Sequence, residues 1–117
     1  NAGFYFVKFN FSHNGTTIEN PNDFADLEAF GENNYSKELD DLEIIINHFK
    51  SQKEVDSTKI FLIGHSRGGG ISIIKTSENQ SISKLITLAS VSTLARFPKD
   101  EAFESWKNDG LGKPKKY

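Results

Sequence analysis

A serine between closely spaced glycines is the residue of this sequence whose setting most clearly suggests chemistry. Residues 64–68 read Gly-His-Ser-Arg-Gly, which fits the pattern G-x-S-x-G, and they follow a mostly apolar run. In this pattern the serine lies on a turn so sharp that side chains two residues before and after it would collide, which explains Gly64 and Gly68. The turn presents Ser66 at the carboxyl end of a strand, where the first N–H groups of the next helix face developing negative charge. The spacing therefore predicts a nucleophilic serine for acyl transfer.

A phosphate-binding loop is one alternative for a stretch so rich in glycine, and its spacing does not fit. A P-loop ends in Gly-Lys-Ser or Gly-Lys-Thr, whereas Gly70 is followed by Ile71 and Ser72. The spacing G-x-G-x-x-G is also absent, because Gly64 and Gly68 are four residues apart. A strand-to-helix corner without chemistry stays open as the second alternative.

The remaining chemistry-bearing residue types form no cluster with a known spacing. The chain contains no cysteine, which excludes disulfides and thiol chemistry. Its three histidines show neither H-x-x-x-H nor H-E-x-x-H spacing. We therefore expect no metal site and no cofactor.

None of the three histidines is an obvious base for Ser66. His65 precedes it on a tight turn, where adjacent side chains point in different directions, so a packing role is expected. His13 follows the first predicted strand and reads as a surface turn residue, with a place in the pocket as the alternative. His48 lies on the charged side of a predicted helix and is expected to be solvated.

The elements that must position the serine alternate along the chain. Apolar residues at helical spacing predict a helix over 36–52, and apolar runs without strict alternation predict strands covered on both faces. The crossovers are long enough to make the strands parallel, so the fold class is α/β, a parallel sheet with flanking helices. The predicted elements are strand 3–11, helix 36–52, strand 59–64, the sharp turn 64–68, helix 67–77 and strand 84–91.

Taken with these elements, the chain resembles the α/β-hydrolase superfamily, in the form seen in esterases and in dienelactone-hydrolase or prolyl-oligopeptidase-like enzymes. GHSRGG after a strand resembles the nucleophile elbow of that superfamily, and KLITLASVS resembles the strand after the elbow helix. FVKFNFSHNG resembles the preceding strand in outline, with Asn10 and Ser12 where relatives often have Asp and Arg. The resemblance implies that residues 1–117 are the central part of a hydrolase domain, with a cap segment at 97–109.

The resemblance also assigns roles to residues of the elbow. It implies Ser66 as the nucleophile and the backbone N–H of Arg67 as one donor to the oxyanion. The superfamily places an acid and then a histidine after the serine, but no histidine follows position 65. The histidine is therefore expected outside these 117 residues. Asp100 and Glu101 stand where some hydrolases carry the acid, although helix capping is the simpler interpretation of both.

These observations predict a serine hydrolase that acts on a small-molecule carboxylic ester through an acyl-enzyme, with an amide as the less favoured substrate class. The alternatives are a non-catalytic hydrolase-fold protein that binds a ligand or partner, and a small self-associating α/β binding domain. Bare sheet edges predict association with the rest of a hydrolase domain or with a second copy.

Composition narrows the classes of partner. A net charge of −2, from 14 basic and 16 acidic residues, argues against nucleic acid. No apolar run approaches the roughly 20 residues of a membrane span. The absence of cysteine and of a signal peptide at the start of the sequence favours the cytoplasm.

Overall fold

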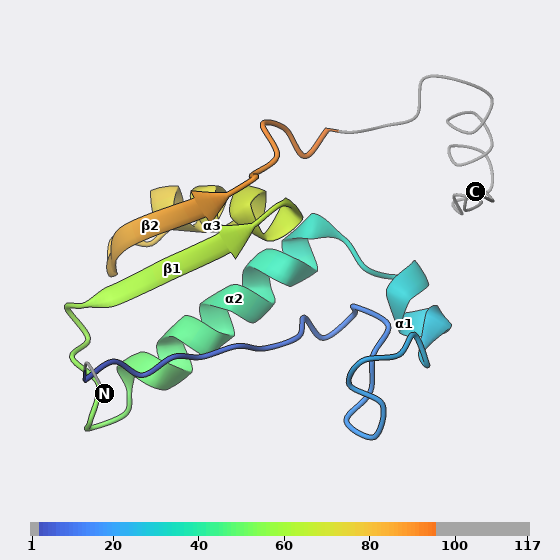
Figure 1. Cartoon of the computed structure of the whole chain (residues 1–117), viewed down its shortest axis with the longest axis horizontal. Helices are drawn as coiled ribbons and strands as arrows, with labels where there is room; N and C mark the ends of the chain where they lie inside the picture. The colour runs from blue at the N-terminus through green and yellow to red at the C-terminus, as the bar shows by residue number, and fades with distance from the viewer. Residues whose placement is uncertain (1–2, 96–117) are drawn as a thin grey trace.

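The computed structural model describes residues 3–95, which form a small α/β unit (Figure 1). Two parallel strands pair with each other, and the helix between them makes the crossover. The elements in chain order are α1 (Leu27–Gly31), α2 (Tyr35–Lys50), β1 (Ile60–His65), α3 (Arg67–Glu78) and β2 (Ile82–Leu88). The predicted α/β class with parallel strands and flanking helices is confirmed.

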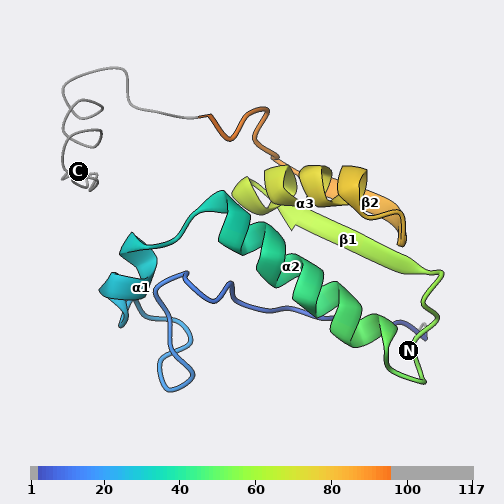
Figure 2. The same ribbon diagram turned by 180° about the vertical axis from the view of Figure 1, so that it is seen from behind.

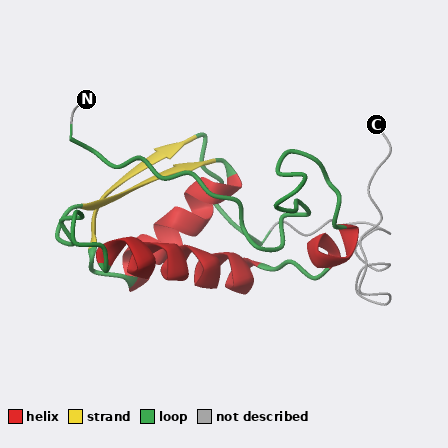
Figure 3. Cartoon of the chain, turned by 90° about the horizontal axis from the view of Figure 1, so that it is seen from below, coloured by secondary structure: helices red, strands yellow, loops and turns green. Residues whose placement is uncertain are grey.

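Both long helices lie on the same side of the two-stranded sheet (Figure 3). Their apolar faces meet the inward side of the strands in a core of Leu42, Ile46, Ile71 and Ile82, of which Ile71 is fully buried. The outward side of the strands carries exposed apolar side chains, namely Phe61, Ile63, Ile86 and Leu88. The expectation that the strands are covered on both faces is therefore wrong for the part of the chain that the structure describes.

The strand predicted at residues 3–11 is also wrong, since this segment is extended but pairs with no other strand in the described structure. It follows the direction of α2 (Figures 1 and 2), lies at the level of the strands in Figure 3, and is held by side chains. Phe9 and Phe11 pack against the core, and the Ser12 N–H donates to Asp41 Oδ2 at 2.7 Å. An aromatic run favours an extended backbone, but a strand needs a neighbouring backbone to bond with.

The other element boundaries differ from the predicted ones by at most three residues. The strand predicted at 84–91 is β2, which starts earlier and stops at Leu88 because the next residue, Ala89, has a φ of 46° that ends the extended backbone. The helices predicted at 36–52 and 67–77 are α2 and α3, and the strand predicted at 59–64 is β1. The cap segment predicted at 97–109 lies outside the described residues.

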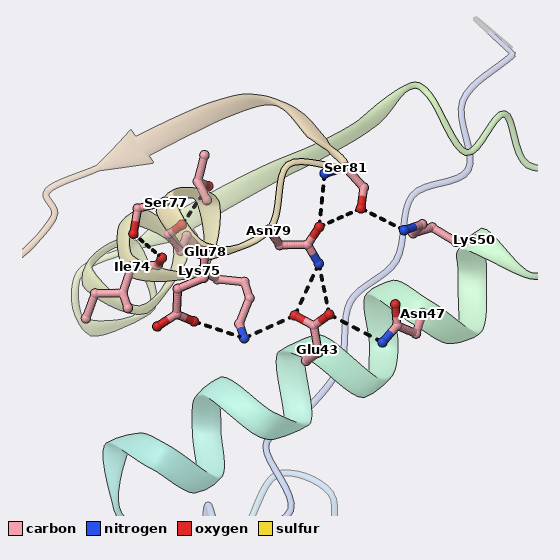
Figure 4. A network of polar contacts seen from close by, with 11 residues as sticks. Glu43, Asn47, Lys50, Ile74, Lys75, Ser77, Glu78, Asn79 and Ser81 are labelled. Atoms are coloured by element: carbon pink, nitrogen blue, oxygen red, sulfur yellow. Dashed lines mark hydrogen bonds and ion pairs between the residues drawn. The ribbon is translucent and has the colours of Figure 1, made fainter.

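A network of polar side chains joins α2 to the last turn of α3 (Figure 4), at the opposite end of that helix from Ser66. Lys75, buried in α3, forms ion pairs with Glu43 of α2 at 3.1 Å and with Glu78 at 3.3 Å. The Asn79 amide donates to both Glu43 oxygens, at 2.9 and 3.1 Å. The hydrogen bond from Lys75 holds the pKa of the Glu43 carboxyl below its ordinary value. Burial alone would lower the pKa of Lys75, but its carboxylate partners outweigh burial and raise it.

Because its pKa is lowered on folding, Glu43 stabilises the folded protein above its ordinary pKa of about 4.3 and loses that effect as the pH falls through the lowered value. Replacing Glu43 by glutamine should lower the free energy of unfolding at pH 7 by about 1 kcal/mol, since the carboxylate is partly exposed. The variant should also depend less on pH in the acid range. Urea unfolding of both proteins between pH 3 and pH 7 measures this, and parallel curves with a constant offset would contradict it.

Candidate active site

Ser66 occupies the corner between β1 and α3 with a strained backbone. Its φ of 52° and ψ of −117° lie outside the conformations that ordinary residues adopt, at a cost of about 1–3 kcal/mol. The chain that leaves β2 holds it there, because the Ser66 N–H donates to the Leu88 carbonyl at 2.9 Å and the Val91 N–H donates to the Ser66 carbonyl at 3.2 Å. Strain of this kind persists only where the surroundings impose it, and it concentrates at functional sites.

The two motif glycines play different parts in this corner. A Cβ added at Gly64 would lie 2.6 Å from the Gly68 carbonyl oxygen and 2.7 Å from the Gly69 Cα, so no side chain fits there. A Cβ added at Gly68 would meet nothing within 4 Å, so the steric reason predicted for Gly68 is wrong. The turn brings the backbone of α3 over Gly64, and Gly68 faces open space.

The next two glycines of α3 allow a close approach of the chain that follows β2. A Cβ at Gly69 would lie 2.7 Å from Ser90 Oγ, and one at Gly70 would lie 2.7 Å from Val91 Cγ2. Three glycines weaken the first turn of a helix by about 1 kcal/mol each relative to alanine. At Gly69 and Gly70 the absence of a side chain lets Ser90 and Val91 lie against α3. Val91 in turn donates to the Ser66 carbonyl and so helps to fix Ser66.

The first turn of α3 leaves backbone donors without acceptors beside the serine. The amides of Gly69 and Gly70 both donate to the Ser66 carbonyl, at 3.1 and 3.3 Å. The amides of Arg67 and Gly68 have no hydrogen-bond acceptor among the described residues, and the Ser66 side chain does not cap the helix. Such amides, at the positive end of a 12-residue helix, are suited to a developing oxyanion. Arg67 stays the predicted donor, and Gly68 supplies a second bare amide.

An apolar groove with a volume of about 1180 Å³ runs along β1 to this corner. It is lined by the extended segment that contains Phe4, Phe9 and Phe11, by β1, and by parts of α2 and β2. The groove reaches the elbow at Gly64, His65 and Gly68. Its lining is suited to an apolar group next to the serine.

No triad is assembled around Ser66 in the described part of the chain. His65 is exposed and lines the groove, while His13 Nδ1 shares a 2.7 Å hydrogen bond with Ser12 Oγ. The His48 ring contacts Phe49 edge to face. Within residues 3–95 no hydrogen bond joins any of the three to the Ser66 hydroxyl.

The candidate acidic residues also form no catalytic arrangement with Ser66 in the described part of the chain. Asp41 of α2 binds a backbone amide, as described above, so its carboxylate has a structural partner. Asp100 and Glu101 lie outside the described residues. The described residues also contain no group of three or more acidic or histidine side chains able to hold a metal ion.

The structure adds a residue that the sequence interpretation overlooked, Glu38, to the surroundings of Ser66. Glu38, in the first turn of α2, is 4% exposed and forms an ion pair with Arg67 at 2.7 Å. A signal was present, because Glu38 is four and eight residues before the buried Leu42 and Ile46, on the buried face of the helix. A charge on such a face requires a partner.

Comparison with known proteins gives one family. Residues 25–109 match the family described as the PGAP1-like alpha/beta domain. The chain belongs to this family. The family is of the α/β-hydrolase type, which confirms the superfamily expected from the elbow but not the esterase, dienelactone-hydrolase or prolyl-oligopeptidase-like form.

No curated protein matches the chain significantly. Within residues 3–95, none of the helices combines the length and the apolar character that crossing a bilayer requires.

Proposed function

We propose that the protein is a serine hydrolase that cleaves a carboxylic ester through an acyl-enzyme on Ser66. The observation that carries the proposal is the strained Ser66 at the strand-to-helix corner, beside the bare amides of Arg67 and Gly68. Membership of an α/β-hydrolase-type family supports it.

The proposed reaction has two steps. In the first, Ser66 Oγ forms a bond to the ester carbonyl carbon, its proton passes to a base, and the carbonyl oxygen becomes an oxyanion facing the Arg67 amide. The carbon–oxygen bond of the ester then breaks and the alcohol leaves with a proton. In the second step, water adds to the acyl group and releases the carboxylic acid, which restores Ser66. The base is proposed to be a histidine other than the three of this sequence.

The reaction favours an ester over an amide, because an alkoxide leaves more readily than an amine, which needs protonation as it departs. The apolar groove along β1 suits the hydrocarbon part of the acyl group or of the alcohol.

A binding protein without catalysis is the second candidate. The exposed apolar side chains on the outward side of the sheet favour a covering surface, either the rest of a hydrolase domain or a second copy. In that case the elbow has only a structural role, and the Ser66 hydroxyl has no enhanced reactivity.

The experiment that separates the two candidates uses the protein at its natural full length with p-nitrophenyl acetate and the matching anilide. We expect a rapid burst of one equivalent of p-nitrophenol, followed by slower turnover, since the acyl-enzyme accumulates. The anilide should react far more slowly. Absence of any turnover above that of the Ser66→Ala variant would support the binding protein instead.

A further inference from the structure

We propose that Glu38 is a positioning residue of the hydrolase site, which holds the Arg67 guanidinium so that the backbone amide of Arg67 stays aimed at the oxyanion. The inference rests on the proposed function. It assigns a role in the reaction to a residue on α2, a helix that lies outside the elbow itself.

The contacts of Glu38 fix its carboxylate on every side that the structure shows. Glu38 Oε1 lies 2.7 Å from Arg67 Nη2, and Arg67 Nε donates to Glu38 Oε2 at 3.1 Å, so the pair is bidentate. Asn33 Nδ2 donates to Oε1 at 2.7 Å. The guanidinium also lies over the Tyr35 ring, 4.5 Å from its centre. Bidentate geometry and the aromatic face together restrict the rotation of the Arg67 side chain.

The cost of this arrangement suggests that it has a function. Glu38 is 4% exposed, whereas the Arg67 side chain is 49% exposed. Burying a carboxylate is expensive even when it is paired, and an apolar residue on the same helix face would often be as stable. An ion pair that spans two helices is therefore weak evidence for stability and better evidence for a fixed geometry.

Arg67 lies where the backbone is intrinsically flexible. It is the first residue of α3, and the three residues after it are glycines, which leave the backbone unusually free. Its amide makes no hydrogen bond among the described residues. The peptide plane that carries this amide is held through the Ser66 carbonyl, which accepts from Gly69, Gly70 and Val91. The Arg67 side chain adds a second hold, from α2. A displacement of about 1 Å at such a donor can cost about a hundredfold in rate.

The pair does not act as a binding site for anionic substrates. The Glu38 carboxylate lies against the guanidinium, and the two opposite charges cancel at short range. An arginine meant to select an anion would be left without such a partner. The geometry favours positioning.

The chain offers a matched control on the same two helices. Glu43 of α2 pairs with Lys75 of α3 at 3.1 Å, which is the same kind of contact at the end far from Ser66. Glu38→Gln and Glu43→Gln thus each remove one carboxylate that pairs with α3. A general role in helix packing predicts similar effects of both changes, while a positioning role predicts an effect on the reaction of Glu38→Gln alone.

The test measures kcat and KM for p-nitrophenyl acetate in both variants of the full-length protein, and the NMR order parameter of the Arg67 amide. Glu38→Gln should lower kcat about tenfold with KM nearly unchanged, because the amide acts on the oxyanion and not on the bound ester. The order parameter should fall from about 0.85 to below about 0.7. Glu43→Gln should change neither quantity.

Four results would overturn the inference. Equal kcat values in Glu38→Gln and wild type, with Ser66-dependent turnover present, would remove the positioning role and leave the proposed function standing. An unchanged order parameter, or equal effects of the two variants, would do the same. Wild-type protein without Ser66-dependent turnover would overturn the proposed function and, with it, this role of Glu38.

Discussion

Replacing Ser66 by alanine should reduce kcat/KM for ester hydrolysis by about 10⁴-fold or more, because loss of the nucleophile removes the covalent route and leaves only binding and the oxyanion donors. The fold should tolerate the change. Within the described residues the Ser66 hydroxyl makes no hydrogen bond, and alanine meets the same backbone strain as serine at a φ of 52°. We expect the free energy of unfolding to change by less than about 0.5 kcal/mol.

Ser77→Ala is the matched control for this experiment. Ser77 is an exposed serine of α3, the helix that Ser66 precedes, and within the described residues its hydroxyl donates only to the Ile74 carbonyl, at 2.7 Å. Its removal should leave kcat/KM unchanged. Equal rates for Ser66→Ala and wild type would contradict a serine mechanism, while unfolding of Ser66→Ala would show that the hydroxyl has a structural role.

Replacing Gly64 by alanine should destabilise the protein by about 3 kcal/mol, at the upper end of the usual cost of an extra methyl group in a packed interior. The new Cβ would meet the Gly68 carbonyl oxygen and the Gly69 Cα at 2.6 and 2.7 Å. Both are backbone atoms of α3, which cannot move aside as a flexible side chain would. The helix would have to shift away from β1, and the corner at Ser66 with it.

Gly68→Ala is the matched control, because the same substitution four residues later is expected not to destabilise the protein. An added Cβ at Gly68 meets nothing within 4 Å, and alanine favours a helix over glycine by about 1 kcal/mol. The variant should be as stable as wild type or up to about 1 kcal/mol more stable. Urea unfolding of the two variants measures the difference, and similar destabilisation by both would contradict the geometry of the elbow.

The sequence predicts best those elements whose pattern is local. The period of apolar residues along α2 and the glycine-bounded serine after β1 are properties of a few neighbouring residues, so both were placed to within two residues. The positive φ of Ala89, which shortens β2, has no comparable signal, because alanine rarely adopts that backbone.

Features that depend on distant partners were harder to predict. The segment at residues 3–11 has the composition of a strand, but strand formation depends on a neighbour that composition does not reveal. The pairing of Glu38 with Arg67 joins residues 29 positions apart, and only the place of Glu38 on an apolar helix face hinted at it. The predicted steric role of Gly68 was wrong because the motif suggests the same role for both of its glycines, whereas α3 covers only Gly64.

The central claim is that Ser66 is an activated nucleophile, and covalent labelling tests it most directly. The full-length protein and its Ser66→Ala variant are incubated with a fluorophosphonate, and the adduct is located by mass spectrometry of the intact protein and of its peptides. We expect one adduct per chain, on the peptide that contains Ser66, and none in the variant. A wild-type protein that stays unlabelled, or that carries the adduct on another residue, would contradict it.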